Sequence, residues 1–311
     1  MMQPNFGLSK LTFRELGEAV QSIYYIGNEV SLLQTYTRLK QFNVSPVFDV
    51  LRLAEIGDTV STIHYLSTWS VAHLQSWSAS RLGKNAIVTS EEELTGFQPP
   101  ADDELGYFKT RWVAESLLCQ AARRGYPVTI SRASAVTATG AATLTRPISR
   151  RGGDTGIATD PNLDQFSTGM ITQMMETGVV PRLEAAHLGS PSPAFAVDVV
   201  PVEYLVSALV ALTNKAPQDP GLPPAAEIYH IGNPKPLKLE DLPAVILQAR
   251  PELKSVRQVT PDEWLRTIEA GGNGLVDKAL AVNVQSAVLR GIHKAGPHYV
   301  LARRDEDTED P

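Results

Sequence analysis

Short apolar runs alternate with longer stretches of helical periodicity along much of the chain. Three runs have the length and the β-branched or aromatic content of buried strands, at residues 22–26, 60–68 and 127–132. Between them, residues 32–53 and 106–125 carry apolar side chains three and four positions apart, which predicts helices. Because buried strands that alternate with helices form parallel sheets, the pattern predicts an α/β fold with a doubly wound sheet.

Capping residues, prolines and glycines set the expected ends of these helices. Thr12 and Glu15 have capping-box spacing within a short N-terminal helix. Pro46 should break or kink the first long helix, because a proline ring clashes with the preceding helical turn. Gly125 is a typical residue for the end of the second long helix.

The composition and the hydrophobic periodicity of the sequence change after the third strand. Residues 133–164 are rich in Thr, Gly and Arg and show little periodicity. We therefore expect a long loop there, at the mouth of the sheet, where open α/β folds carry their substrate loops. Later patterns predict one more strand at residues 227–232 and four helices at residues 166–177, 202–212, 237–248 and 261–270.

The composition is that of a globular protein that buries a sizeable core. The 311 residues are 43% hydrophobic and 20% charged, and the formal net charge is −6. This charge argues against nucleic-acid binding, and no apolar run reaches the roughly 18 residues that a membrane span needs. Because the N-terminus lacks the apolar core of a signal peptide, we expect a cytoplasmic protein.

Metal and thiol chemistry have little support in the sequence. Cys119 is the only cysteine, which leaves neither a disulfide framework nor a thiolate metal site. The six histidines show no paired spacing with each other or with carboxylates that metal sites use. We therefore expect no bound metal.

The helix over residues 106–125 carries the first candidate for chemistry. Tyr107 and Arg111 are four residues apart, so they share one face of this helix. A fixed positive charge beside a phenol stabilises the phenolate, which makes Tyr107 a candidate proton donor or acceptor. The alternative is a surface Tyr/Arg pair on an amphipathic helix, which the spacing alone does not exclude.

The segments around this helix resemble a known family in order and spacing. The phrases that carry the resemblance are IHYLSTWSV (63–71), GYFKTRWVAESLL (106–118), RRGYPVTISRAS (123–134), NFGLS (5–9), FAVDVVPVEYLVSALVAL (195–212) and EIYHIGNPKPLKLEDL (227–242). They resemble extended short-chain dehydrogenase/reductases of the male-sterility type, and among them the thioester reductase (R) domains of polyketide and nonribosomal peptide synthetases. The resemblance implies a Rossmann-like fold, NADPH as cofactor, and a substrate held as a thioester on the phosphopantetheine arm of a carrier protein.

The resemblance also implies roles for individual residues. Thr68 would hold the substrate oxygen, with Ser67 as its substitute if the register differs by one, and Tyr107 would exchange the proton. Arg111 stands where the family has a lysine that activates the tyrosine and holds the cofactor ribose. Gly27, Asn43 and Ser67 occupy positions of the family's cofactor-binding shell.

Two departures from the family bear on the cofactor. Arginine at position 111 keeps the positive charge, but it is larger and planar and is not deprotonated. No G-x-G-x-x-G or G-x-x-G-x-x-G turn occurs, although such a turn brings a pyrophosphate to backbone N–H groups. Aligned with the family, the chain begins after two βα units, on the order of 60 to 80 residues. We therefore expect that this chain does not itself bind NADPH.

The expected architecture is a truncated Rossmann-like core with a smaller, mostly α-helical substrate lobe. The core comprises residues 1–132 and returning segments near 195–232. The lobe comprises residues 133–194 and 233–301, and residues 302–311 form a disordered acidic tail.

Three functions remain open from the sequence. The first is reductive release of a carrier-bound acyl thioester, within a parent synthetase or with the missing part supplied by another chain. The second is a redox-inactive, Dieckmann-type cyclase that uses Tyr107 and Thr68 and needs no hydride. The third is a non-catalytic protein that binds a carrier, and that forms an oligomer or complex through its exposed sheet edge.

Overall fold

The computed structural model describes a large part of the chain. The described residues are 3–31, 34–69, 71, 106–137, 174–182, 196–197, 199–214, 223–235, 237–238, 241–260, 263–264 and 266–267. They divide into two compact units, one made of residues 1–134 and 207–231 and the other of 135–206 and 232–311. The segment expected to return to the core at 195–232 is thus divided between the two units.

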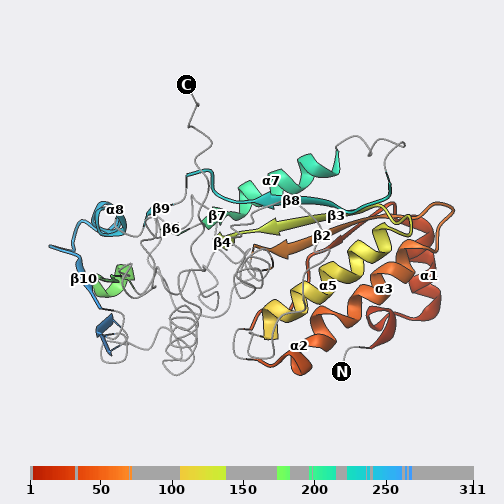
Figure 1. The fold of residues 1–311 in the computed structure, drawn as a ribbon, viewed down its shortest axis with the longest axis horizontal. Helices are drawn as coiled ribbons and strands as arrows, with labels where there is room; N and C mark the ends of the chain where they lie inside the picture. Colours follow the sequence, from red (N-terminus) through yellow and green to blue (C-terminus); the bar gives the residue numbers. More distant parts are fainter. Residues whose placement is uncertain are drawn as a thin grey trace, which may run out of the picture. The chain divides into compact units, whose positions relative to one another are not determined.

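A parallel sheet organises the first unit (Figure 1). Its strands are β1 (Ser22–Tyr25), β2 (Thr62–Thr68), β3 (Val128–Ala133) and β8 (Glu227–Ile231), and their order among the described residues is β1-β2-β3-β8. Every described pairing in this sheet is parallel. The prediction of an α/β fold with a parallel sheet is confirmed.

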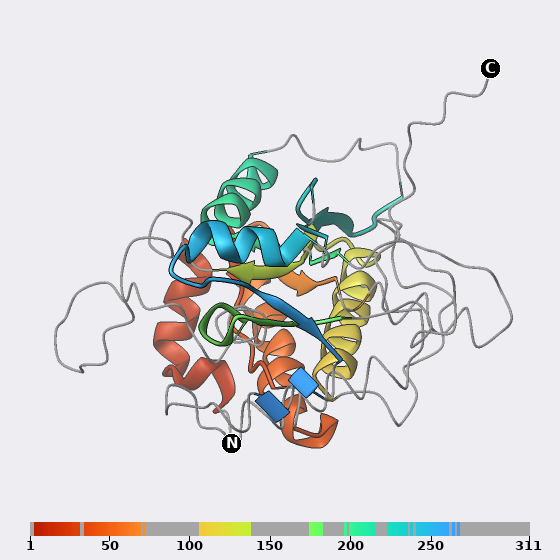
Figure 2. The same ribbon diagram turned by 90° about the vertical axis from the view of Figure 1, so that its left-hand side faces the viewer.

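One face of this sheet carries the helices α1 (Lys10–Ala19), α2 (Tyr36–Asn43), α3 (Ser45–Ala54) and α5 (Gly106–Ala122) (Figure 2). The helix α7 (Val202–Thr213) lies on the opposite side. The core between the strands and the layer of α1, α2, α3 and α5 is apolar, because every second strand residue and one stripe each of α3 and α5 point inward. Cys119 is a buried member of this core.

One helix boundary differs from the sequence prediction, and one agrees with it. The N-cap of α1 is Ser9, whose Oγ accepts a hydrogen bond from the N–H of Thr12 at 3.1 Å, so Thr12 is not the cap. The break expected at Pro46 is confirmed, because α2 ends at Asn43 and α3 begins at Ser45. Pro46 occupies the first turn of α3, where its missing N–H leaves no helical bond unmade.

The far side of the sheet contacts α7 (Val202–Thr213) through an edge residue. The hydroxyl groups of Tyr24 in β1 and Thr213 at the end of α7 are hydrogen-bonded. Tyr24 also stacks on His64 of β2, with ring centroids 4.8 Å apart. Residues 62, 64, 66 and 68 of β2 therefore face this side, while 63, 65 and 67 face the helix layer.

Among the described residues, the second unit contains short strands, the helix α8 and further helical residues at 174–177, 263–264 and 266–267. Its elements are β4 (Ala135–Thr137), β5 (Val179–Pro181), β6 (Ala196–Val197), β7 (Val199–Pro201), β9 (Leu237–Lys238), α8 (Leu242–Ala249) and β10 (Arg257–Val259). Strands β4 and β7 pair in parallel, as do β5 and β10, whereas β6 and β9 are antiparallel. A 3-10 turn, η1 (Pro4–Gly7), precedes α1 in the first unit.

Two predictions for this region were partly wrong. Residues 135–137 of the expected loop instead form the strand β4, which pairs with β7, and residues 138–164 lie outside the described residues. The helix expected over 237–248 begins only at Leu242, because residues 237–238 form β9. The acidic tail at 302–311 and most of the helix expected at 261–270 lie outside the described residues.

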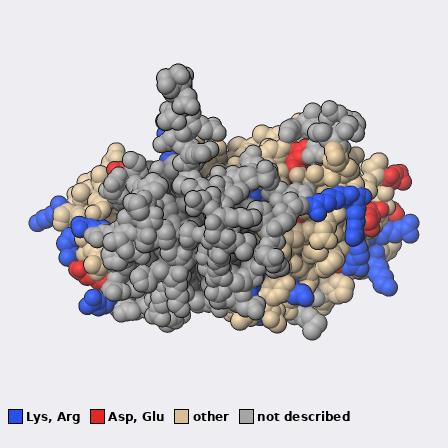
Figure 3. All heavy atoms as spheres, viewed as in Figure 1, with Lys and Arg blue, Asp and Glu red and all other residues tan. Residues whose placement is uncertain are grey.

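Among the described residues, no helix combines the length and the apolar character needed to cross a membrane. The same part of the chain holds no group of three or more His, Cys, Asp or Glu side chains arranged to bind a metal. Acidic and basic side chains lie next to one another at the end of the molecule that carries α1 (Figure 3), where Arg14 and Glu18 form an ion pair of 2.7 Å.

Candidate functional site

Helix α5 presents polar side chains to the sheet at successive turns. Tyr107, Arg111 and Glu115 are each four residues apart, so they lie on one stripe of the helix. The start of α5 packs tightly, since a Cβ on Gly106 would come within 2.4 Å of the backbone at Gln34 and Tyr36. Glycine at this position therefore fixes how closely the Tyr107 end of the helix approaches the α2 region.

Arg111 is held inside the protein at the end of β2. Its side chain is only 2% exposed, and its Nη2 donates a hydrogen bond to the carbonyl oxygen of Leu66. The guanidinium lies 4.7 Å from the ring centroid of Tyr65 and 6.0 Å from that of Tyr107. Arg111 and Tyr107 are thus neighbours, as their spacing predicts.

The charge of Arg111 is balanced by its surroundings. Burial by itself lowers the pKa of Arg111, but the phenol groups of Tyr65, Tyr107 and Tyr25 and the Glu115 carboxylate outweigh it and raise that pKa. Burial also raises the pKa of Tyr25 to about 12, against the opposing effect of Arg111. Within the described part of the chain, the Nε and Nη1 groups of Arg111 have no hydrogen-bond partner.

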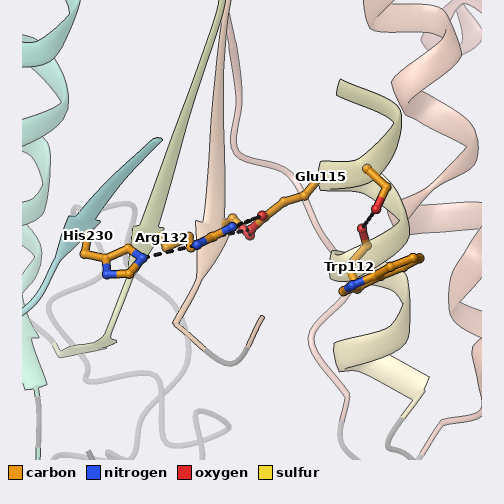
Figure 4. Close-up of polar contacts among 6 residues, drawn as sticks. Trp112, Glu115, Arg132 and His230 are labelled. Carbon is orange, nitrogen blue, oxygen red and sulfur yellow. Dashed lines mark hydrogen bonds and ion pairs between the residues drawn. The ribbon is translucent and has the colours of Figure 1, made fainter. Parts of the chain in front are cut away.

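A buried ion pair lies one turn further along α5 (Figure 4). Glu115 accepts hydrogen bonds from Nε and Nη2 of Arg132 at 3.1 and 2.9 Å, and both side chains are 0% exposed. Glu115 also accepts a hydrogen bond from the Oγ of Ser67. On the other side, Nη1 of Arg132 lies 3.2 Å from Nε2 of His230.

This network spans the sheet because its strand residues are in register. Ser67 is paired with Arg132, and Arg132 with His230, so the three side chains stand on one face of β2, β3 and β8. Glu115 meets them from α5. The ring of His230 also lies 4.7 Å from that of Trp69, just past the end of β2.

The two adjacent hydroxyl residues of β2 have different surroundings. The Oγ of Ser67 is buried and bonded to Glu115, which leaves it little access to a substrate. Thr68 is half-buried, is the last residue of β2, and starts from the opposite face of the strand. Of the two candidates for holding a substrate oxygen, Thr68 therefore has the more open position.

The remaining predicted cofactor residues lie near the end of β1. Asn43 is fully buried, and its amide bonds the backbone of Glu29 at 2.7 and 3.0 Å and the hydroxyl of Thr110 at 3.0 Å. These contacts fasten the loop after β1 to α5. A Cβ on Gly27 would meet nothing within 4 Å, so its surroundings are open.

These placements bear on whether NAD(P)H fits the described residues. A dinucleotide needs backbone N–H groups at a close turn for its pyrophosphate, and polar side chains within reach of its ribose. Arg111, Asn43 and Ser67 instead direct their polar groups into the protein and are almost fully buried. These three side chains therefore offer no contact to a cofactor ribose, and we derive no hydride step from them.

Sequence reasoning missed Glu115, Arg132 and His230 as parts of this site. A signal existed, since Glu115 continues the four-residue spacing of Tyr107 and Arg111 on a largely apolar helix. A second signal was Arg132 at the end of an apolar strand, because a buried arginine requires a partner. Sequence alone did not show that the two signals belong together.

The model of the family described as male sterility protein, an NAD-binding family, matches residues 1–209. The hybrid PKS-NRPS synthetase pyvA of Aspergillus violaceofuscus is 37% identical over 310 residues, which are 97% of this chain and 8% of the relative. The hybrid PKS-NRPS synthetase pynA of Aspergillus niger is 36% identical over 276 residues, 88% of this chain and 7% of the relative.

A solved structure supports the fold. The terminal R domain from the myxalamid PKS-NRPS biosynthetic pathway has a TM-score of 0.66 and 26% identity, over 97% of this chain and 64% of that one. The fold is therefore the Rossmann-like fold of R domains. The chain spans less than a tenth of the length of the two curated relatives and about two thirds of the solved R domain.

Proposed function

We propose, because the chain belongs to the male sterility protein family, that it takes part in releasing an acyl chain held as a thioester on a carrier protein. Its similarity to hybrid PKS-NRPS synthetases and to a terminal R domain supports this class of reaction and a role in secondary-metabolite biosynthesis. The partner would be an acyl or peptidyl carrier domain, with the chain on its phosphopantetheine arm.

The observation that carries the proposal is the pairing of Tyr107 with Arg111 on α5, beside the end of β2. The guanidinium of Arg111 lies 6.0 Å from the Tyr107 ring, and it also bonds Leu66, two residues before Thr68. A phenol and a hydroxyl in this setting can donate hydrogen bonds to a thioester oxygen as negative charge develops on it. In this proposal Tyr107 exchanges a proton and Thr68 holds the oxygen.

Two reactions belong to this class. The first is NAD(P)H-dependent reduction of the thioester, which the description of the relative as an R domain supports. The second is a Dieckmann-type condensation, which the buried positions of Arg111 and Asn43 favour, because neither of these two side chains is then available to a ribose.

The condensation needs no oxidant or reductant. A proton leaves the carbon beside a second carbonyl group, and the resulting carbanion attacks the carbonyl carbon of the thioester. A carbon–carbon bond forms, the carbon–sulfur bond to the carrier breaks, and the thiolate takes up a proton. Tyr107 would exchange the proton, and Thr68 would stabilise the oxyanion between the two steps.

A single-turnover assay of the 311-residue chain tests the proposal. A carrier domain is loaded with an acyl-phosphopantetheine whose chain can cyclise, and products are identified by mass spectrometry with and without NADPH. A cyclic product without NADPH supports the condensation, whereas an aldehyde or alcohol formed only with NADPH supports reduction. A loaded carrier that binds the chain but stays intact under both conditions refutes catalysis and leaves a carrier-binding protein.

A further inference from the structure

The two residues that precede Thr68 in β2 are both bonded to α5. The carbonyl of Leu66 accepts a hydrogen bond from Arg111, and the hydroxyl of Ser67 donates one to Glu115. Both partners lie on the stripe of α5 that begins with Tyr107. The helix that carries the candidate acid is therefore attached at two points to the strand that carries the candidate hydroxyl.

We propose that Arg111 and Glu115 form a two-point attachment, the α5 clamp, which sets the position of Thr68 relative to Tyr107. Both are positioning residues that do not touch the substrate. Arg111 acts through the backbone carbonyl of Leu66, and Glu115 acts through the side chain of Ser67. The catalytic part of this inference rests on the proposed function, whereas the attachment itself does not.

The reach of arginine explains why this position suits it. The guanidinium is planar and carries five donors on a long side chain, so it can stack on Tyr65 and still reach the carbonyl of Leu66. A lysine has a compact ammonium group on a flexible stem and lacks this planar fork. Arginine at position 111 therefore fixes the strand end rather than only supplying charge.

Burial of the second point argues for a positional role. Glu115 and Arg132 are fully buried. The free energy needed to remove two charges from water can exceed the free energy gained from their attraction. Apolar side chains of similar volume could fill the same space, and the loss of the ion pair itself would cost little stability. The ion pair instead fixes positions, because Glu115 accepts directional hydrogen bonds from both Ser67 and Arg132.

Hydrogen exchange at single amides tests the attachment without any assay of activity. The N–H of Trp69 donates to the carbonyl of Ala133 at 2.9 Å at the clamped end of β2, and the N–H of Ile63 donates to Pro127 at 2.8 Å at the other end. Both bonds join β2 to β3. We expect Ser67→Ala and Arg111→Met each to speed exchange at Trp69 about 10-fold or more and to leave Ile63 within about 2-fold.

A matched control distinguishes the effect of breaking the α5 clamp from the effect of removing a serine hydroxyl group elsewhere on α5. Ser116 lies next to Glu115 on α5, but its Oγ bonds the carbonyl of Trp112 in the same helix at 2.9 Å. Ser116→Ala should leave exchange at both Trp69 and Ile63 unchanged. Ser67→Ala keeps the test decisive if Arg111→Met does not fold.

Release kinetics of the same variants test the consequence for catalysis. A displaced Thr68 should lower kcat about 100-fold while KM stays within about 3-fold, because substrate binding is retained and only alignment is lost. If the wild-type chain releases no acyl group, the proposed function is refuted. Hydrogen exchange at Trp69 then remains the test of whether the α5 clamp holds the end of β2.

Either of two results would overturn the inference. One is exchange at Trp69 that is as slow in both clamp variants as in the wild type. The other is equal acceleration at Trp69 and Ile63, which would mean that the substitutions loosen the whole sheet. Unchanged kcat in a variant with fast exchange at Trp69 would refute the positioning of Thr68.

Discussion

The buried ion pair of Glu115 and Arg132 allows a quantitative prediction. Arg132→Met removes the cation of the ion pair and leaves the Glu115 carboxylate enclosed, with 0% exposure and, among the described residues, the Ser67 hydroxyl as its remaining hydrogen-bond partner. Removing one partner of a buried ion pair costs about 3 to 5 kcal/mol. For a domain of this size, where 1 kcal/mol shifts Tm by about 2 to 4 °C, the loss corresponds to roughly 6 to 20 °C.

Removing both charges together should cost less. In the double variant Glu115→Met, Arg132→Met, neither charge of this pair remains buried, and the apolar side chains fill a similar volume. The hydroxyl of Ser67 and the imidazole of His230 each lose a partner, at about 1 kcal/mol apiece. The double variant should therefore be about 2 kcal/mol less stable than the wild type, and more stable than Arg132→Met.

Thermal and urea unfolding of the full chain measure this order. Circular dichroism follows the helices, and the fluorescence of Trp69 and Trp112 reports on the first unit. If the free energy of unfolding of the double variant were lower than that of Arg132→Met, as it would be if the two substitutions destabilised the chain independently, the reasoning would be contradicted. An Arg132→Met variant with wild-type stability would also contradict it.

Three further outcomes follow from burial and close approach. Burial lowers the pKa of His64, so the unfolded chain binds the proton first and the free energy of unfolding falls as the pH drops below about 6.5; urea titrations at pH 7.5 and 5.5 should show a smaller fall in His64→Phe. Burial raises the pKa of Tyr25 to about 12, so the unfolded chain loses its phenol proton first and stability falls as the pH rises above about 10; the Tm of Tyr25→Phe should fall less over this range. Gly106→Ala places a Cβ 2.4 Å from the carbonyl oxygen of Gln34 and should lower Tm by several degrees, whereas Gly27→Ala, in open surroundings, should change Tm little.

The strands and the long helix could be predicted from periodicity because each is a local property of the chain. β2, β3 and α5 lie within one to three residues of their expected ends. The cap of α1 was misplaced because two capping patterns overlap there, one that starts at Ser9 and one that starts at Thr12. Only the folded backbone selects between them.

The contacts of the site could be predicted only in part. Four-residue spacing places Tyr107 and Arg111 together, but it does not show that the guanidinium reaches Leu66 in another element. The network of Ser67, Arg132 and His230 depends on strand register, which brings residues far apart in sequence to one face. A single sequence contains no record of that register.

The measurement that tests the account most directly is acyl release by the double variant Thr68→Val, Tyr107→Phe. We expect the wild-type chain to release the acyl group from a loaded carrier, and the double variant to do so at least about 100-fold more slowly. Tyr126→Phe, which removes a phenol bonded to Glu55 elsewhere in the first unit, serves as the control and should match the wild type. Release by the double variant at the wild-type rate would contradict the assignment of Thr68 and Tyr107 as the reacting groups.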